Sequence, residues 1–150
     1  MPSCRYNPDT FGFLVTDISR LYRAEIDRHI VDAGLEFTPA EARTLVHVAR
    51  HAPVRQAVLA ERMGIEAMTL SGHLDRLEGA GMIQRIPDPN DRRAKQVHLT
   101  DAAEKALETI HRISSDIRAV VAQSVAPVDW ERLNTILKDI RNDLVAKTRS

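Results

Sequence analysis

Two adjacent arginines, Arg92 and Arg93, follow the turn-forming sequence Asp88–Pro89–Asn90. Pro and Asn favour a turn because Pro fixes its own backbone and Asn hydrogen-bonds to nearby backbone groups. A guanidinium group stays charged and binds phosphate oxygens with paired hydrogen bonds, and it is also attracted into a narrow, electronegative minor groove. The arginine pair therefore predicts an exposed loop suited to a nucleic-acid backbone.

The residues that flank this loop predict the strands of a β-hairpin. After the loop, Val97 and Leu99 are apolar, whereas Gln96 and His98 are polar. Alternation with a period of two is typical of a half-buried strand. The preceding run 82–86 can supply the partner strand, so the two arginines would lie near the tip of the hairpin.

Two short helices are predicted immediately before the hairpin, at residues 54–62 and 66–80, separated by Met63–Gly64–Ile65. Two helices joined by a short turn with a glycine form a helix-turn-helix. In the second helix three leucines recur at spacings of four and three and give it a core side: Leu70, Leu74 and Leu77. A helix-turn-helix followed by a hairpin is a winged helix.

The other side of the second helix carries mostly short or polar side chains that can approach base edges in a major groove: Met68, Thr69, Gly72, Asp75 and Arg76.

The order of several motifs extends this interpretation. They are Thr38–Arg43, Leu59–Gly64, Leu74–Glu78, Gly81–Arg85, Asp88–Arg93 and Val97–Thr100. In this order they resemble the MarR-type transcriptional regulators. The resemblance implies a mostly α-helical fold with a small β-hairpin wing, and a homodimeric, ligand-responsive repressor that binds a palindromic operator in double-stranded DNA. Residues 38–99 would bind DNA, and residues 1–37 and 100–150 would form a helical dimerisation region.

The resemblance also implies roles for the wing residues. Arg93 matches the arginine that family members insert into the minor groove, and Asp91 matches the acidic residue that braces it. Arg92 and Lys95 are expected to contact phosphates.

In the second helix, Thr69, Ser71, Gly72 and Arg76 match the positions that contact bases and phosphates. Gly72 departs from many members, which carry arginine there; it removes a guanine-reading side chain and costs roughly 1 kcal/mol of helix stability relative to Ala. His73 lies near the edge of the core side, so packing and DNA contact are both open, and Ser71 could equally be buried.

Helices are also predicted outside the winged helix. Apolar residues at helical spacing mark residues 10–33, with Gly34 as a stop, and a capping box from Thr38 to Glu41 with Pro39 starts a helix that ends near His51. Thr100 is expected to cap a long helix that Pro127 breaks. Apolar stripes at 10–33, 100–124 and 128–147 predict a dimer.

An effector site rests on the family resemblance alone, which implies small aromatic acids as ligands. Tyr22, His47 and His51 are the candidate residues. His47 and His51 are four residues apart, a spacing compatible with metal ligands. No third ligand stands out, so a histidine pair without metal is favoured.

Cys4 offers an alternative, a redox-sensing regulator. In family members that sense hydroperoxides, the thiol lies inside the first helix, where this chain has Gly12, and its accompanying tyrosine corresponds to Thr16. Cys4 precedes that helix on a loose arm, so an incidental thiol is favoured.

Composition permits these functions without arguing for them, because 21 basic residues balance 21 acidic ones. A single cysteine, the lack of a long apolar run and the lack of a signal pattern predict a cytoplasmic protein without a membrane segment. No catalytic motif or cofactor site appears, so an enzyme is not expected. A winged helix that binds only proteins is a further alternative, but it would not need arginines at the wing.

Overall fold

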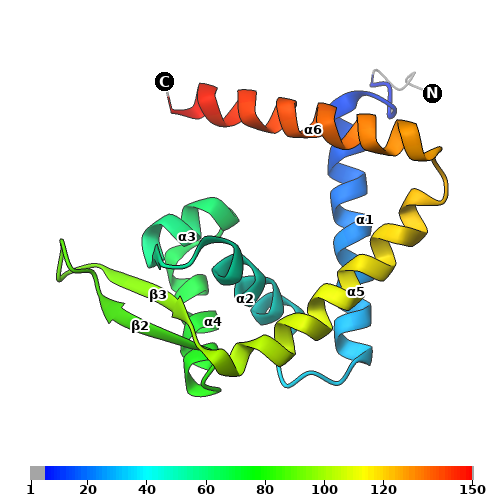
Figure 1. Ribbon diagram of the computed structural model, residues 1–150. Helices are drawn as coiled ribbons and strands as arrows, with labels where there is room; N and C mark the ends of the chain where they lie inside the picture. The colour runs from blue at the N-terminus through cyan, green and yellow to red at the C-terminus, as the bar shows by residue number, and fades with distance from the viewer. Residues whose placement is uncertain (1–5, 150) are drawn as a thin grey trace, which may run out of the picture. The chain divides into compact units, whose positions relative to one another are not determined.

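A computed structural model describes residues 6–149 and shows a mostly helical chain with a small antiparallel sheet (Figure 1). The elements are α1 (Phe11–Asp32), α2 (Pro39–His51), β1 (Val54–Arg55), α3 (Gln56–Met63), α4 (Ala67–Gly79), β2 (Ile83–Pro87), β3 (Lys95–Leu99), a 3₁₀ turn (Asp101–Ala103), α5 (Glu104–Ala122) and α6 (Pro127–Thr148). The chain divides into two compact units, and the boundary falls between Ile113 and Ser114, within the range of α5. In residues 6–149 no helix is both long and apolar enough to cross a bilayer.

The start of α2 follows the predicted capping box. The backbone N–H of Glu41 donates to Thr38 Oγ1 at 3.2 Å, and the backbone N–H of Thr38 donates to Glu41 Oε2 at 3.1 Å. Pro39 occupies the first turn, where its missing N–H costs nothing. The predicted end of α1 is also confirmed, because Gly34 adopts a φ of 67°, a conformation that side chains disfavour.

The predicted helix at 54–62 begins later than expected, at Gln56. Val54 and Arg55 instead form β1, which pairs with β3 in the register Val54–Val97 and Arg55–Gln96. The β-branched side chain of Val54 is buried, and the partner strand satisfies backbone groups that a helix would otherwise satisfy. The sheet order is β1-β3-β2.

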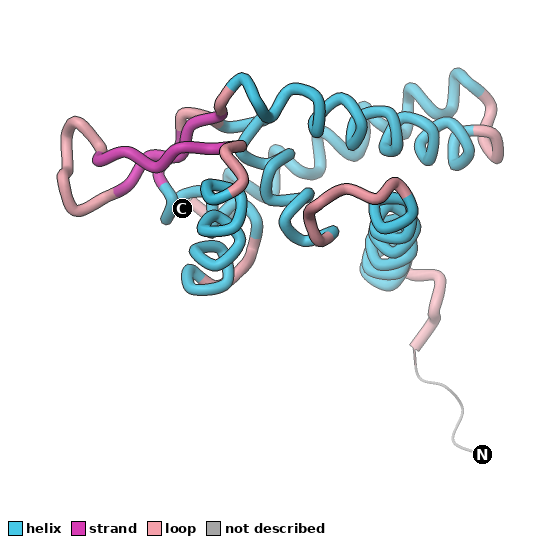
Figure 2. The backbone as a smooth tube through the Cα atoms, turned by 90° about the horizontal axis from the view of Figure 1, so that it is seen from below, coloured by secondary structure: helices cyan, strands magenta, loops and turns pink. Residues whose placement is uncertain are grey.

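The wing, residues 83–99, is the predicted hairpin. β2 and β3 pair antiparallel from Ile83–Leu99 to Pro87–Lys95. At the end of the two strands, the backbone N–H of Asp88 donates a hydrogen bond to the Ala94 carbonyl at 2.9 Å and closes the base of the loop between β2 and β3. This loop extends past the sheet (Figure 2). Val97 is buried while Arg92 and Arg93 are exposed, as the alternation and the turn predicted.

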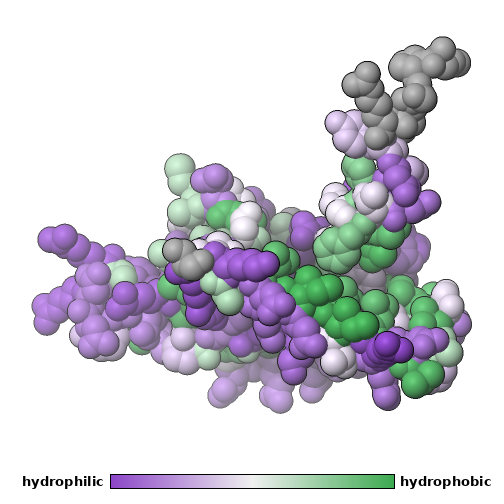
Figure 3. Space-filling view, turned by 90° about the horizontal axis from the view of Figure 1, so that it is seen from above, coloured by the Kyte–Doolittle hydropathy of each residue, from purple (hydrophilic) through white to green (hydrophobic). Residues whose placement is uncertain are grey.

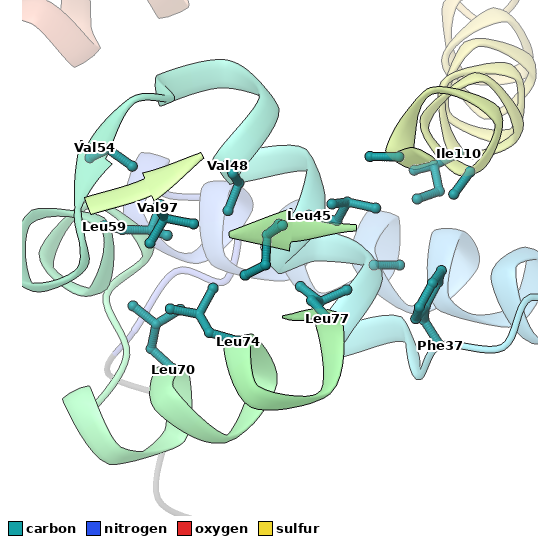
Figure 4. Packing of buried hydrophobic residues seen from close by; sticks show 14 of the residues in the cluster. Phe37, Leu45, Val48, Val54, Leu59, Leu70, Leu74, Leu77, Val97 and Ile110 are labelled. Carbon is teal, nitrogen blue, oxygen red and sulfur yellow. The ribbon is translucent and has the colours of Figure 1, made fainter. Parts of the chain in front are cut away.

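The three leucines of α4 form the centre of the core. Leu70, Leu74 and Leu77 point toward Leu45 of α2 and Leu59 of α3 (Figure 4). Burying one such side chain stabilises the folded state by roughly 1.5–3 kcal/mol, so the three leucines hold α4 firmly against α2 and α3. The same core reaches outward to Ile30, Ala103, Ala106 and Ile110, so parts of α1 and α5 pack on the winged helix.

Two expectations for the C-terminal helices differ from the structure. Thr100 makes no side-chain cap; its hydroxyl donates to the Gly81 carbonyl at 2.5 Å, and a 3₁₀ turn precedes α5. Pro127 does not interrupt α5, which already ends at Ala122. It occupies the first turn of α6, the helical position that tolerates a missing N–H.

Candidate nucleic-acid interface

The outward side of α4 is formed by small or apolar residues at its start. Ala67, Met68, Thr69 and Gly72 are all exposed, and Met68 is exposed to 88%. Because the core leucines fix the opposite side, this surface faces away from the protein interior. The N-terminal residues of the second helix are those that reach base edges in a helix-turn-helix.

Arg76 lies farther along α4 and is held by α2. Its Nη1 atom lies 3.1 Å from Oε1 of Glu41, whose side chain is only 5% exposed. Glu41 therefore serves twice, as the capping residue of α2 and as the ion-pair partner of Arg76. The guanidinium itself remains largely exposed, so it can contact a phosphate while paired.

Asp75 is also paired. Arg85 of β2 donates to Asp75 Oδ1 at 2.5 Å and to Glu78 Oε1 at 3.0 Å. The hydrogen bond from the Arg85 side chain is the main cause that lowers the pKa of Glu78. These contacts link the wing to α4.

His73 and Ser71 are both half-buried, as their position at the edge of the core side allowed. The Thr44 hydroxyl donates to the Ala40 carbonyl at 2.9 Å and lies 3.1 Å from His73 Nδ1. The Nδ1 side of the His73 ring is therefore hydrogen-bonded to α2 within the chain. His73 thus has a packing role, and its Nε2 atom is the one left for any outside contact.

In the wing, Asp91, Arg92, Arg93 and Lys95 are exposed. Asp91 accepts a hydrogen bond from the backbone N–H of Arg93 at 3.0 Å. The expected brace between the Asp91 carboxylate and the Arg93 guanidinium is not seen: within residues 6–149 no ion pair joins them. Asp91 instead shapes the loop backbone that carries Arg93, because an Asp side chain readily bonds an N–H two residues later.

The carboxylate that anchors the wing is Asp88, which sequence reasoning treated only as a turn residue. Asp88 is 2% exposed and accepts hydrogen bonds from Arg55 Nε at 2.8 Å and Gln96 Nε2 at 3.1 Å. The backbone N–H groups of Asn90 and Asp91 also donate to it, at 2.8 and 3.2 Å. The Arg55 hydrogen bond, followed by that of the Asn90 N–H, lowers the pKa of Asp88 to about 2. The Asp-Pro-Asn sequence signals the turn, but nothing near it signals Arg55.

The candidate effector residues give a mixed result. His47 and His51 stack with ring centroids 6.1 Å apart, and His51 Nδ1 lies 2.7 Å from Arg62 Nη1. His47 Nδ1 is buried without a hydrogen-bond partner, and burial is the main cause that lowers the pKa of His47. Tyr22 is half-buried in α1. Open hollows of about 530 Å³ along α1 and about 580 Å³ beside the start of α5 are lined by none of the three.

A metal at this pair gains no support from the structure. Across residues 6–149 no three His, Cys, Asp or Glu side chains are placed to hold an ion together. Cys4 lies outside the described residues.

These features define a class of protein, the winged helix-turn-helix proteins, with an arginine-bearing wing. Residues 37–95 match the sequence model of the MarR family. The transcriptional regulator PA3341 is 32% identical over 91% of this chain and 99% of its own, with a TM-score of 0.75. A probable transcriptional regulator from Pseudomonas aeruginosa is 27% identical over 88% of this chain and 97% of its own, with a TM-score of 0.68. MarR from E. coli in its apo form is 21% identical over 90% and 98%, with a TM-score of 0.76, and shares the fold.

The chain belongs to the MarR family of transcriptional regulators.

Proposed function

We propose that this protein represses transcription as a homodimer that binds a palindromic operator. The observation that carries the proposal is the pairing, on one rigid winged helix, of an outward α4 side made of small residues with a wing that exposes Arg92 and Arg93. In this arrangement α4 enters the major groove and the wing reaches the flanking minor groove. Arg92, Lys95 and Arg76 contact phosphates.

The dimer is supported by apolar side chains that the single chain leaves open. They are Phe11, Phe13, Leu14, Ile18 and Leu21 in α1, and Val128, Leu133, Ile136, Leu137 and Leu144 in α6. Figure 3 shows hydrophobic residues at the molecular surface among hydrophilic ones, whereas the wing at the left is mostly hydrophilic. Exposed apolar surface of this extent is typical of a protein–protein interface. A palindromic operator is matched by a dimer with two-fold symmetry, so the expected partner is a second copy of this chain.

Selection of bound duplexes from a random library, followed by a mobility shift, tests the proposal. We expect a palindromic site whose half-sites lie about one helical turn apart, roughly 34 Å, or a multiple of that distance. A transcription assay from a promoter carrying the site then separates repression from activation. Binding that never distinguishes the selected site from random DNA would contradict the proposal.

Control by a small aromatic acid is a further part of the proposal. The buried, unpartnered Nδ1 of His47 is the observation that favours a ligand near this residue, because buried polar atoms are normally hydrogen-bonded. Salicylate is the probe, and we expect it to weaken operator binding at millimolar concentrations. Titration calorimetry without heat, together with an unchanged mobility shift, would argue for a regulator without this effector or for the redox alternative.

The redox alternative concerns Cys4 and is tested separately. With an incidental thiol, Cys4→Ser keeps operator binding, and peroxide does not release the wild-type protein through this residue. Peroxide-induced release that disappears in the serine variant would establish Cys4 as a sensor.

A further inference from the structure

Every charged residue of α4 is engaged within the chain. Asp75 and Glu78 pair with Arg85, and Arg76 pairs with the buried carboxylate of Glu41. All three residues lie in the second half of the helix. The first half of α4, which enters deepest in a helix-turn-helix, therefore carries no charged side chain, and the nearest charge is the exposed Glu66, which precedes the helix at its N-cap.

The side chains that α4 does present there are apolar or small. Met68 is exposed to 88%, the highest value among the large apolar side chains of residues 6–149, and Thr69 beside it offers a methyl group. Both lie in the first turn of the helix. A flexible, polarisable thioether adapts well to an apolar surface supplied by a partner.

Gly72 lies one turn farther on the same side and is not required by the chain itself. A Cβ added there would meet no atom within 4 Å, and its φ is not positive. A glycine inside a helix is normally replaced at no loss, since Ala is the better helix former. Its bare backbone does, however, let a partner approach α4 closely.

We propose that Met68 and Thr69 read thymine methyl groups in the major groove and that Gly72 makes room for this close approach. The C5-methyl of thymine is the apolar group on the major-groove edge, so the apolar side chain of Met68 and the methyl group of Thr69 select it over the guanine acceptors, which need a hydrogen-bond donor. The base pairs under the start of α4 are therefore A·T pairs with thymine facing Met68. The inference rests on the proposed DNA binding, and it specifies how the half-site is read.

Replacing single thymines with deoxyuridine tests this readout, because the exchange removes the methyl group and keeps every hydrogen-bonding group. Binding of the selected operator is measured by fluorescence anisotropy at one salt concentration. We expect a deoxyuridine under α4 to weaken binding roughly fourfold, the effect of one buried methyl-sized group, while deoxyuridine outside the half-site changes nothing.

Met68→Ala completes the test as a double-mutant cycle. The variant should bind the natural operator more weakly and should no longer respond to deoxyuridine at the thymine that Met68 contacts. Val46→Ala is the matched control, since Val46 is an exposed apolar residue on α2. Gly72→Ala should raise the melting temperature yet weaken operator binding. A glycine that the fold itself required would instead give a lower melting temperature when replaced by Ala.

Two results overturn the inference in distinguishable ways. An operator that binds equally well with deoxyuridine at every position, but loses affinity when guanine is replaced by 7-deazaguanine, shows guanine readout and leaves the regulator function intact. A protein that selects no DNA at all overturns the proposed function together with the readout.

Discussion

The guanidinium of Arg55 and the carboxylate of Asp88 form an ion pair that joins the short strand β1 to the base of the wing loop. Arg55 Nε lies 2.8 Å from Asp88 Oδ2, and Arg55 Nη2 lies 3.3 Å from Oδ1. Arg55 directly precedes α3, the first helix of the helix-turn-helix. The ion pair therefore ties the position of the wing to the position of the two helices, and we regard Arg55 as a positioning residue for the wing.

Asp88→Asn is expected to weaken operator binding without touching DNA. The amide keeps the size of the side chain but loses the charge that holds Arg55 and the two loop N–H groups. Mobility shifts should show a clear loss of affinity, and Arg93→Ala should add less in this background than in the wild type. Asp101→Asn, which alters an exposed carboxylate, is the control. Equal affinity of Asp88→Asn and wild type would show that the wing needs no anchor.

The same carboxylate predicts a loss of stability in acid. Because the pKa of Asp88 is lowered from 3.8 to about 2, its contribution is complete above pH 3.8 and is lost as the pH falls toward 2. Thermal unfolding across this window should decline less steeply in Asp88→Asn than in the wild type. Parallel curves for the two proteins would contradict the assigned role of Asp88.

The two wing arginines are expected to differ. Arg93→Ala should weaken operator binding by roughly 1–3 kcal/mol and relax the preference at the flanking base pairs, where a narrow A·T-rich groove attracts the guanidinium. Arg92→Ala should weaken all sequences evenly and reduce the slope of binding against salt by about one. Both residues are exposed, so the melting temperature should hardly change. Wild-type affinity of Arg93→Ala at physiological salt would disprove the minor-groove contact.

His47 predicts a second pH effect, near neutrality. Burial lowers the pKa of His47 in the folded protein below its ordinary value of 6.5. Above pH 6.5 the imidazole is neutral in both the folded and the unfolded protein. Below pH 6.5 the unfolded chain binds the proton first. Stability is therefore lost as the pH falls through 6.5. His47→Leu should flatten this decline and should not lower stability at pH 8, since it removes an unpartnered nitrogen. His111→Leu, at an exposed position of α5, is the control in the same unfolding series.

Ile136→Asp in α6 is expected to produce a folded monomer. Ile136 is 46% exposed in the single chain, so a charge there costs the fold little but would be buried by a partner copy. Light scattering should show the loss of the dimer, and specific DNA binding should disappear with it. Lys138→Asp, at an exposed polar position of the same helix, should remain a dimer. A wild-type protein that is monomeric at micromolar concentration would refute the proposed assembly.

The elements that depend on neighbouring residues could be predicted from the amino-acid sequence. The Thr38–Glu41 capping box, the left-handed Gly34 and the leucines of α4 act over a few residues, so periodicity and turn chemistry predict them. The alternation after Arg93 likewise predicted the wing. These are also the features that place the candidate site on α4 and the hairpin.

Contacts between segments that lie far apart in the sequence could not be predicted and depend on the folded arrangement of the chain. Val54 joins a strand because Val97 is beside it, Thr100 bonds Gly81 instead of capping a helix, and Asp88 meets an arginine 33 residues away. Local sequence patterns cannot reveal such partners, because a polar group forms a hydrogen bond with the donor or acceptor that folding places about 3 Å from it, wherever that residue stands in the sequence. For the same reason, the sequence indicated only a turn at Asp88, whereas packing buries its carboxylate beside Arg55 and makes it the anchor of the wing.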